Sequence, residues 1–293
     1  MHPDPLLTWL QGGFFFPYKN YKVFYRQQGE GPSVVLLHGF PAASWYWHKI
    51  WNELTRHARL LAPDLLGFGF SDKPPDYAYS IADQADVIEY LVSEVGKVDF
   101  HLLAHDYGAA VALELVARLQ EKKAQKKSYF RIQSVCLLNA CLFNEDCQLP
   151  RMHSLMASTF GSLAPRQLAR ALMNQQCRLY APPHQPTPQE RSCFLQLLQH
   201  NNGFQVMPLL SRYVYEQNTL AGKWKSALKE LDIPLQLIWG TDDPMVGTKA
   251  AATLKQLNPR LKIILLDNTG HFPHLETPEK VIEHYTRFLS RKF

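Results

Sequence analysis

Short apolar runs alternate with segments of helical spacing along most of this chain, and this alternation constrains its fold more than any other feature. Buried strands are indicated by the runs VVLL, RLLAP, VDFHLLAH, IQSVCLLNA, PLQLIWG and KIILLD. Between these runs, segments such as IADQADVIEYLVSEV, which Ser80 can cap, and DYGAAVALELVARLQ repeat apolar residues at helical spacing. Strands that alternate with helices of this length indicate βαβ units. We therefore predict an α/β fold, in which a mainly parallel twisted sheet is flanked by helices.

Two parts of the chain depart from this pattern. Residues 21–26 alternate in polarity, which predicts an edge strand as the first element of the fold. Residues 143–228 are rich in helical patterns and prolines and contain no clear strand. The simplest organisation is one core, residues 1–142 and 229–293, interrupted by a helical cap, residues 143–228. Because the insertion follows the carboxyl end of a strand, where ligand sites in parallel sheets lie, we expect the cap to cover the site.

Charge and hydropathy argue against several classes of partner. The 293 residues carry a net charge of only +5, and no stretch of 18 apolar residues occurs, so we expect no nucleic-acid partner and no membrane span. The one dense basic cluster, residues 118–131, follows a helix pattern and precedes a strand pattern, which is typical of a solvated helix end. The N-terminal residues do not follow the pattern of a signal peptide.

The five cysteines stand at scattered positions, with no CxxC pair and no Cys/His spacing of a metal site. We therefore expect no metal. We also expect no cofactor, because Gly67 and Gly69 of GFGF lack the following glycine and the helix start of a nucleotide-binding motif. An odd number of scattered cysteines also favours free thiols that pack as small apolar side chains in a reducing environment. A cytoplasmic protein that acts on a small substrate is the resulting expectation.

The stretch LLAHDYGAAVALEL combines a strand end, a tight turn and a helix start around Asp106. Small residues, Ala104 and Gly108, stand two positions before and after it, as a sharp strand-to-helix turn requires. Such a turn exposes its central side chain beside the N–H groups of the following helix. Asp106 is therefore a candidate nucleophile, although a helix cap is an alternative that its residue type equally permits.

A second loop motif, HGFP at residues 38–41, directly follows the buried strand at residues 34–37. The backbone N–H groups of Phe40 and Tyr107 could together form an oxyanion hole with two donors. His38 and Trp45, from the same part of the chain, are candidates for contact with a substrate.

Two further motifs follow strands near the end of the sequence. Asp242 and Asp243 come directly after the run PLQLIWG, and either acid could orient a histidine. His271 lies in a Gly-His-x-Pro-x-x-Glu-x-Pro motif between the last strand and the last helix. The chain order of nucleophile, acid and histidine is that of a hydrolytic triad on an α/β scaffold. Together these motifs predict a hydrolase.

The motifs resemble those of the α/β-hydrolases with an aspartate nucleophile, the group that includes epoxide hydrolases and haloalkane dehalogenases. The resemblance rests on VVLLHGFP, LLGFGFSDKP, LLAHDYG, DDPMV and HFPHLETP, and it extends through the cap in NNGFQVMPLLSRY. It implies the α/β-hydrolase fold, with Asp106 as nucleophile and His271 as the base that activates water. Asp243, which stands directly before the proline, matches the acid that orients the base, and Asp242 is the second choice.

The resemblance also suggests a proton donor in the cap. Epoxide hydrolases of this group use cap tyrosines to protonate the oxygen of the opened ring. Tyr213 stands at about the expected place, and Tyr215 and Tyr180 are weaker candidates.

An aspartate nucleophile favours displacement at saturated carbon. Its carboxylate, with an ordinary pKa of about 3.9, is already ionised at neutral pH, whereas its attack on an ester would give a mixed anhydride. We therefore expect hydrolysis of a small apolar epoxide to a diol through an ester on Asp106. Haloalkane dehalogenases hold the halide with a tryptophan after the nucleophile, where this chain has Tyr107, so dehalogenation is the second expectation. The third is a non-catalytic member of the fold that binds a ligand or lipid.

Overall fold

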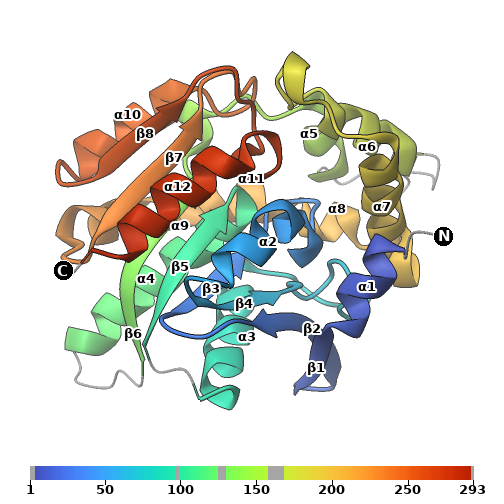
Figure 1. Ribbon diagram of the computed structural model, residues 1–293, viewed down its shortest axis with the longest axis horizontal. Coiled ribbons are helices and arrows are strands. Elements are labelled where there is room, and N and C mark those ends of the chain that lie inside the picture. Colours follow the sequence, from blue (N-terminus) through green and yellow to red (C-terminus); the bar gives the residue numbers. More distant parts are fainter. Residues whose placement is uncertain (1–3, 97–98, 125–129, 158–167, 292–293) are drawn as a thin grey trace.

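The computed structural model describes residues 4–96, 99–124, 130–157 and 168–291. One sheet with strand order β1-β2-β4-β3-β5-β6-β7-β8 crosses this described part (Figure 1). Its strands are β1 (Gly13–Tyr18), β2 (Tyr21–Gln28), β3 (Ser33–Leu37), β4 (Arg59–Pro63), β5 (Asp99–His105), β6 (Arg131–Leu138), β7 (Leu235–Gly240) and β8 (Lys262–Leu266). The strands β3 to β8 pair in parallel, and β1 and β2 join the sheet antiparallel. The predicted mainly parallel sheet is confirmed.

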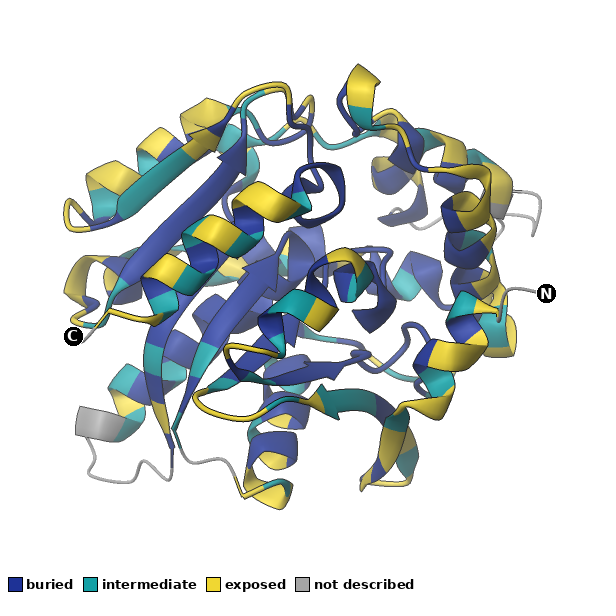
Figure 2. Ribbon diagram, in the orientation of Figure 1, coloured by how far each residue is buried: buried dark blue, intermediate teal, exposed yellow. Residues whose placement is uncertain are grey.

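Helices cover both faces of this sheet (Figure 1). On one face α2 (His48–Leu54) contacts α12 (Pro278–Leu289), and the other face carries α3 (Ile81–Glu94), α4 (Tyr107–Ala124), α9 (Tyr213–Glu230) and α10 (Thr248–Leu257). As predicted, Ser80 caps α3, because its hydroxyl accepts the N–H of Asp83 at 3.0 Å. Figure 2 shows β7 buried along its length and β5 and β6 buried except near their first residues, as their apolar runs require.

The N-terminal part of the fold differs from the prediction. A short helix, α1 (Pro5–Gln11), and the strand β1 precede residues 21–26, so β1 is the edge strand and β2 lies inside the sheet. The strand β1 was missed because three consecutive phenylalanines, residues 14–16, hide the alternation of an edge strand. Aromatic contacts with β2 hold it, with ring centroids 5.6 Å apart for Phe14 and Tyr25.

The segment between β6 and β7 carries the cap. Its described residues contain helices and no strand, as predicted, and Figure 1 shows α5–α8 as a group at the right of the view. The elements are η2 (Asn144–Asp146), α5 (Arg151–Ala157), α6 (Leu168–Cys177), η4 (Pro182–His184), α7 (Pro188–Gln199), η5 (His200–Gln205) and α8 (Met207–Leu210). The boundaries at 142/143 and 228/229 remain predictions. The helix α9 crosses the second boundary, and its Lys223 and Trp224 already bond to Glu114 of α4.

The cysteine expectation is wrong for one pair. Cys141 and Cys147 form a disulfide, whereas Cys136, Cys177 and Cys193 are free and buried. The turn after β6 brings the paired residues to a Cα separation of 5.9 Å, a distance that sequence spacing alone does not reveal. Because two of the five cysteines form a disulfide, the cysteines no longer indicate a reducing environment.

The basic cluster at residues 118–131 is compensated by acids where the structure describes it. Arg118 bonds to Glu114 at 2.9 Å and to Asp86 at 2.6 Å, and Arg131 bonds to Asp99 at 2.8 Å. Residues 125–129 of the cluster lie outside the described residues. Within the ranges that are described, no helix is long and apolar enough to cross a membrane.

Candidate active site

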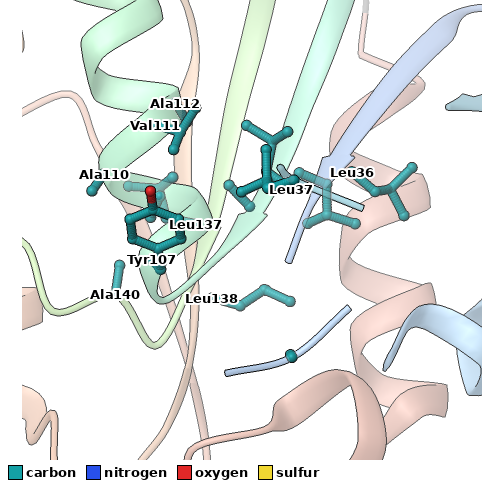
Figure 3. Packing of buried hydrophobic residues seen from close by; sticks show 14 of the residues in the cluster. Leu36, Leu37, Tyr107, Ala110, Val111, Ala112, Leu137, Leu138 and Ala140 are labelled. Atoms are coloured by element: carbon teal, nitrogen blue, oxygen red, sulfur yellow. The ribbon is translucent and has the colours of Figure 1, made fainter. Parts of the chain in front are cut away.

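Asp106 occupies a sharp turn between β5 and α4. Its φ of 46° lies in the left-handed region, which non-glycine residues seldom adopt. The turn needs small neighbours: a Cβ on Gly108 would lie 2.3 Å from the carbonyl oxygen of Leu37. Figure 3 shows Tyr107, the next residue, among buried side chains of α4 and β6. The predicted strand–turn–helix is therefore present. The expectation that it exposes its central side chain is wrong, because the loops of Phe40 and His271 leave the side chain of Asp106 only 2% exposed.

One oxygen of Asp106 faces backbone N–H groups. The N–H of Phe40 donates to Oδ2 at 3.0 Å, and burial raises the pKa of Asp106 while the N–H groups of Phe40 and Tyr107 favour its ionised form. Gly39 permits this approach, because a Cβ there would lie 2.7 Å from Nδ1 of His105. The structure thus brings together the two N–H groups that the sequence suggested. Contact with Phe40, on another loop, also goes beyond what a helix cap would make.

The candidate base lies on the other side of the carboxylate. His271 Nε2 is 4.0 Å from Oδ1 of Asp106, and its Nδ1 is 2.8 Å from Oδ2 of Asp243. Among the described residues, Oδ1 of Asp106 has no hydrogen-bond partner. Of the two acids left open by the sequence, Asp243 contacts His271, while Asp242 is exposed and accepts a bond from its neighbour Thr241.

Asp243 is held by more than the histidine. Its Oδ1 accepts the N–H groups of Met245 at 2.8 Å and Val246 at 3.0 Å, and its Oδ2 also accepts Nδ2 of Asn139 at 2.8 Å. The other end of Asn139 accepts the N–H of Gly240 at 2.8 Å. Sequence reasoning missed Asn139, although its place directly after β6 was a usable signal.

Carboxylates dominate the electrostatics of His271. Burial lowers the pKa of His271, but the carboxylates of Asp243 and Asp106 oppose this and leave the pKa raised. His105, the residue before Asp106, packs its ring 4.8 Å from the ring of His271, and burial lowers its pKa well below the usual range. A neutral His105 can donate its Nε2–H to the backbone carbonyl of His271, 2.8 Å away.

Tyr213 is the candidate cap tyrosine that packs against Phe40 and Tyr107, the residues whose N–H groups face Asp106. It begins α9, is buried, and places its ring 4.6 Å from that of Tyr107 and 5.9 Å from that of Phe40. Burial raises the pKa of Tyr213 well above its usual range, and the charge of Asp106 raises it further. Tyr215 is 54% exposed, and Tyr180 stacks on Phe272 instead. These contacts distinguish Tyr213 from the two weaker candidates.

A cap histidine that the sequence did not suggest also lies here. The ring of His153 in α5 is 4.8 Å from that of Phe40 and 5.3 Å from that of Tyr213. Burial lowers the pKa of His153 to about 4, so the side chain is neutral near pH 7. Sequence reasoning had no signal for it, because an isolated histidine in a helical segment carries no motif.

The two remaining candidates have structural partners. His38 is close to backbone atoms at both ring nitrogens, the carbonyl of Gly39 at 2.9 Å and the N–H of Leu65 at 3.0 Å. Trp45 stacks on His48 and meets Phe194 of the cap edge to face. These contacts favour structural roles for both, rather than contact with a substrate. The described residues also contain no group of three His, Cys, Asp or Glu side chains that could hold a metal ion.

Comparison with known proteins identifies the family of the chain. The α/β hydrolase fold family matches residues 32–278. The chain belongs to the α/β hydrolase fold family. The mesoderm-specific transcript protein of Mus musculus is 34% identical to this hydrolase over 300 residues, which cover 97% of the chain and 88% of the relative.

Solved structures share the fold at lower identity. The haloalkane dehalogenase DatA from Agrobacterium tumefaciens C58 matches with a TM-score of 0.80 and 20% identity, over 95% of this chain and 96% of its own. The epoxide hydrolase CorEH matches with a TM-score of 0.77 and 18% identity, over 95% and 98% of the two chains. At these identities the likeness concerns the fold alone. The family match and the similar relative, not these structures, make this chain an α/β-fold hydrolase.

Proposed function

We propose that this hydrolase opens small apolar epoxides to diols through a covalent ester on Asp106. The observation that carries the proposal is the unequal environment of the two oxygens of Asp106. Oδ2 accepts the N–H of Phe40, whereas Oδ1, on the side of His271, has no hydrogen-bond partner among the described residues. Oδ1 is therefore the oxygen available for attack on carbon.

The first step forms a C–O bond between Oδ1 and an epoxide carbon, and it breaks the bond from that carbon to the ring oxygen. The resulting alkoxide takes a proton from Tyr213, whose hydroxyl stays protonated because burial and Asp106 raise its pKa. Contacts of the Tyr213 ring with Phe40 and Tyr107, whose N–H groups face Asp106, support this role.

The second step hydrolyses the ester. His271 Nε2 removes a proton from water, which attacks the carbonyl carbon of the Asp106 ester, and the N–H groups of Phe40 and Tyr107 stabilise the charge that develops on Oδ2. One such donor contributes roughly 3–4 kcal/mol. The bond between that carbon and Oδ1 then breaks, and the diol leaves with Oδ1 after taking the proton held by His271. The second proton of the water restores the hydroxyl of Tyr213, which leaves Asp106 ionised. Esterification removes the negative charge of Asp106, which had raised the pKa of His271. The histidine is thus more easily neutral when it must act as a base.

Residues around the leaving-group side favour an epoxide over a halide. The side chains of Phe40 and Tyr107 lack the ring N–H with which a tryptophan would hold a halide ion. A tyrosine in the cap supplies the acid that an epoxide oxygen needs and a halide does not. We propose a small apolar substrate because the rings of Phe40, Tyr107, Tyr213 and His153 are packed together beside Asp106.

The covalent step can be tested by trapping the ester. His271→Gln removes the base, so an ester on Asp106 should accumulate when the protein meets a panel of epoxides and 1-haloalkanes. Intact-protein mass spectrometry distinguishes the electrophiles, because an epoxide adds its whole mass whereas a haloalkane adds its alkyl group in place of a proton. We expect adducts from epoxides, and none in Asp106→Asn/His271→Gln.

Each alternative has its own outcome in this experiment. Adducts from haloalkanes alone would replace epoxide hydrolysis with dehalogenation. No adduct from any electrophile would contradict the covalent mechanism and favour a member of the fold that only binds its ligand.

A further inference from the structure

Glu276, in the short helix α11 (Pro273–Glu276), holds both neighbours of the candidate base. Its side chain is buried, and its Oε2 accepts the N–H of Gly270 at 2.7 Å while Oε1 accepts the N–H of Phe272 at 2.9 Å. These are the residues directly before and after His271. The carboxylate therefore fixes the backbone from which the imidazole projects.

The same carboxylate also binds the cap. Oε2 of Glu276 accepts a second N–H, that of Ala181, at 2.8 Å. Two residues earlier in the cap, the carbonyl of Leu179 accepts the N–H of His271 at 2.9 Å. A Cβ on Gly270 would lie 2.4 Å from that carbonyl oxygen, so the cap segment 179–181 lies directly against the loop of His271.

We propose that Glu276 is a positioning residue that couples the seating of the cap segment 179–181 to the geometry of the base His271. The inference rests on the proposed function, in which His271 activates water. When the cap moves away, the bonds to Ala181 and Leu179 break together, and the loop of His271 loses partners on both sides of the imidazole. Water activation then depends on a closed cap.

Only a carboxylate fits this place well. Three N–H groups converge on two oxygens, and both oxygens act as acceptors. Glutamine has the same shape but offers one acceptor oxygen and an NH₂ group, so at least one N–H would face another donor. A buried N–H group without an acceptor costs free energy. We therefore expect Glu276→Gln to loosen the loop of His271.

The charge of Glu276 gives a second, independent readout. It raises the pKa of His271, so its removal moves the titration of His271 to lower pH. Glu276→Asp separates this effect from that of a displaced loop, because it keeps the charge while it shortens the side chain. The other groups that face His271 are the carboxylates of Asp243 and Asp106 and the neutral rings of His105 and His274.

The test compares Glu276→Gln with a matched control. Glu114 is also buried and also has three partners, Arg118, Lys223 and Trp224, but it joins α4 to α9 away from the base. His271 is titrated by NMR in protein labelled at histidine carbon, with its signal assigned by loss in His271→Gln. We expect the midpoint to move to lower pH in Glu276→Gln and to stay in place in Glu114→Gln.

Hydrogen exchange and kinetics complete the test. The amides of Ala181, Gly270 and Phe272 should exchange faster in Glu276→Gln. With an electrophile that alkylates Asp106, hydrolysis of the ester should slow by about tenfold or more, and alkylation by less. Glu276→Asp keeps the charge but is one methylene shorter. Hydrogen exchange of these amides should therefore be faster, while the midpoint of the His271 titration stays closer to that of the unmodified protein.

The inference is overturned if Glu276→Gln leaves the His271 midpoint and the exchange of these amides unchanged. Titration and exchange need no substrate. If no electrophile alkylates Asp106, the proposed function fails, while these two measurements still decide whether Glu276 couples the cap to His271.

Discussion

At the scale of single residues, the two carboxylate oxygens of Asp106 have different neighbours. Oδ2 of Asp106 lies 3.0 Å from the N–H of Phe40, and Oδ1 lies 4.0 Å from His271. In the proposed reaction the first becomes the carbonyl oxygen of the ester and the second forms the new bond. The positive φ of Asp106 and the close approach of Gly39 are what make this division possible.

Tyr213→Phe tests the proton donor. We expect it to slow alkylation of Asp106 by epoxides by about 100- to 10,000-fold, the usual range for loss of general acid catalysis. Haloalkanes need no proton on their leaving group, so any alkylation by them should continue at its former rate. The time course of adduct formation in a His271→Gln background measures both. Equal rates of epoxide alkylation with and without the hydroxyl would assign the acid elsewhere.

The sequence predicted the residues of this site whose roles are tied to motifs. Asp106, Asp243 and His271 follow strand ends, and parallel strands bring such positions to one edge of the sheet. Asn139 escaped prediction because its bond to Asp243 joins segments far apart in the chain. Glu276 stands in the quoted motif of His271, but its bond to the cap is also long-range and appears only in the structure. Their residue types alone do not reveal which N–H or carboxylate they will meet.

At the scale of elements, the connection from β6 into the cap is tied at several points. The disulfide joins Cys141 to Cys147, the carbonyl of Cys141 accepts Nε2 of Gln217 at 2.7 Å, and the N–H of Gln148 donates to Met245 at 2.8 Å. Met245 in turn donates to Asp243. The entry to the cap is thus fastened to the loop that carries the acid.

Removing the disulfide by Cys141→Ser/Cys147→Ser should lower the free energy of unfolding by about 2 kcal/mol. The estimate follows from the small loop that a sequence separation of 6 closes. Urea unfolding measures it, and the double variant serves as its own control because reductant should not change its midpoint. If reductant does not change the urea midpoint of the unmodified protein, the disulfide does not have the stabilising role.

The elements themselves were largely predictable because buried strands carry unbroken apolar runs. The strand β1 was missed because its exposed positions also carry apolar residues. Phe14 and Phe15 are about half exposed on an edge strand, so apolar residues occupy positions where alternation requires polar ones.

At the scale of the whole molecule, two of the contacts between the core and the cap lie next to each other beside the candidate base. Lys49 of α2 bonds to Glu190 of α7 at 2.8 Å and to the carbonyl of Leu275 at 3.0 Å. Beside it, the segment 179–181 bonds to the loop of His271. The cap therefore rests on the part of the core that carries the base.

Gly270→Ala should disturb the contact between the cap segment 179–181 and the loop of His271. The added Cβ would lie 2.4 Å from the carbonyl oxygen of Leu179 and 2.6 Å from the N–H of Ala181, so the cap segment must shift. We expect a loss of about 1–3 kcal/mol in unfolding free energy and a 10- to 100-fold slower hydrolysis of the ester. Gly222→Ala in α9, where a Cβ meets nothing within 4 Å, is the matched control and should leave hydrolysis unchanged. Equal effects of the two substitutions on hydrolysis would contradict the coupling.

The bond between His271 and Leu179 also bears on how such proteins can be recombined. A chimaera that takes its cap from one relative and its last strand and helix from another would divide this contact between two parents. A chimaera should therefore take residues 179–181 and 270–276 from the same parent, although about ninety positions separate the two segments in the sequence. Crossover points that keep both segments from the same parent should yield active chimaeras more often than points that fall between them.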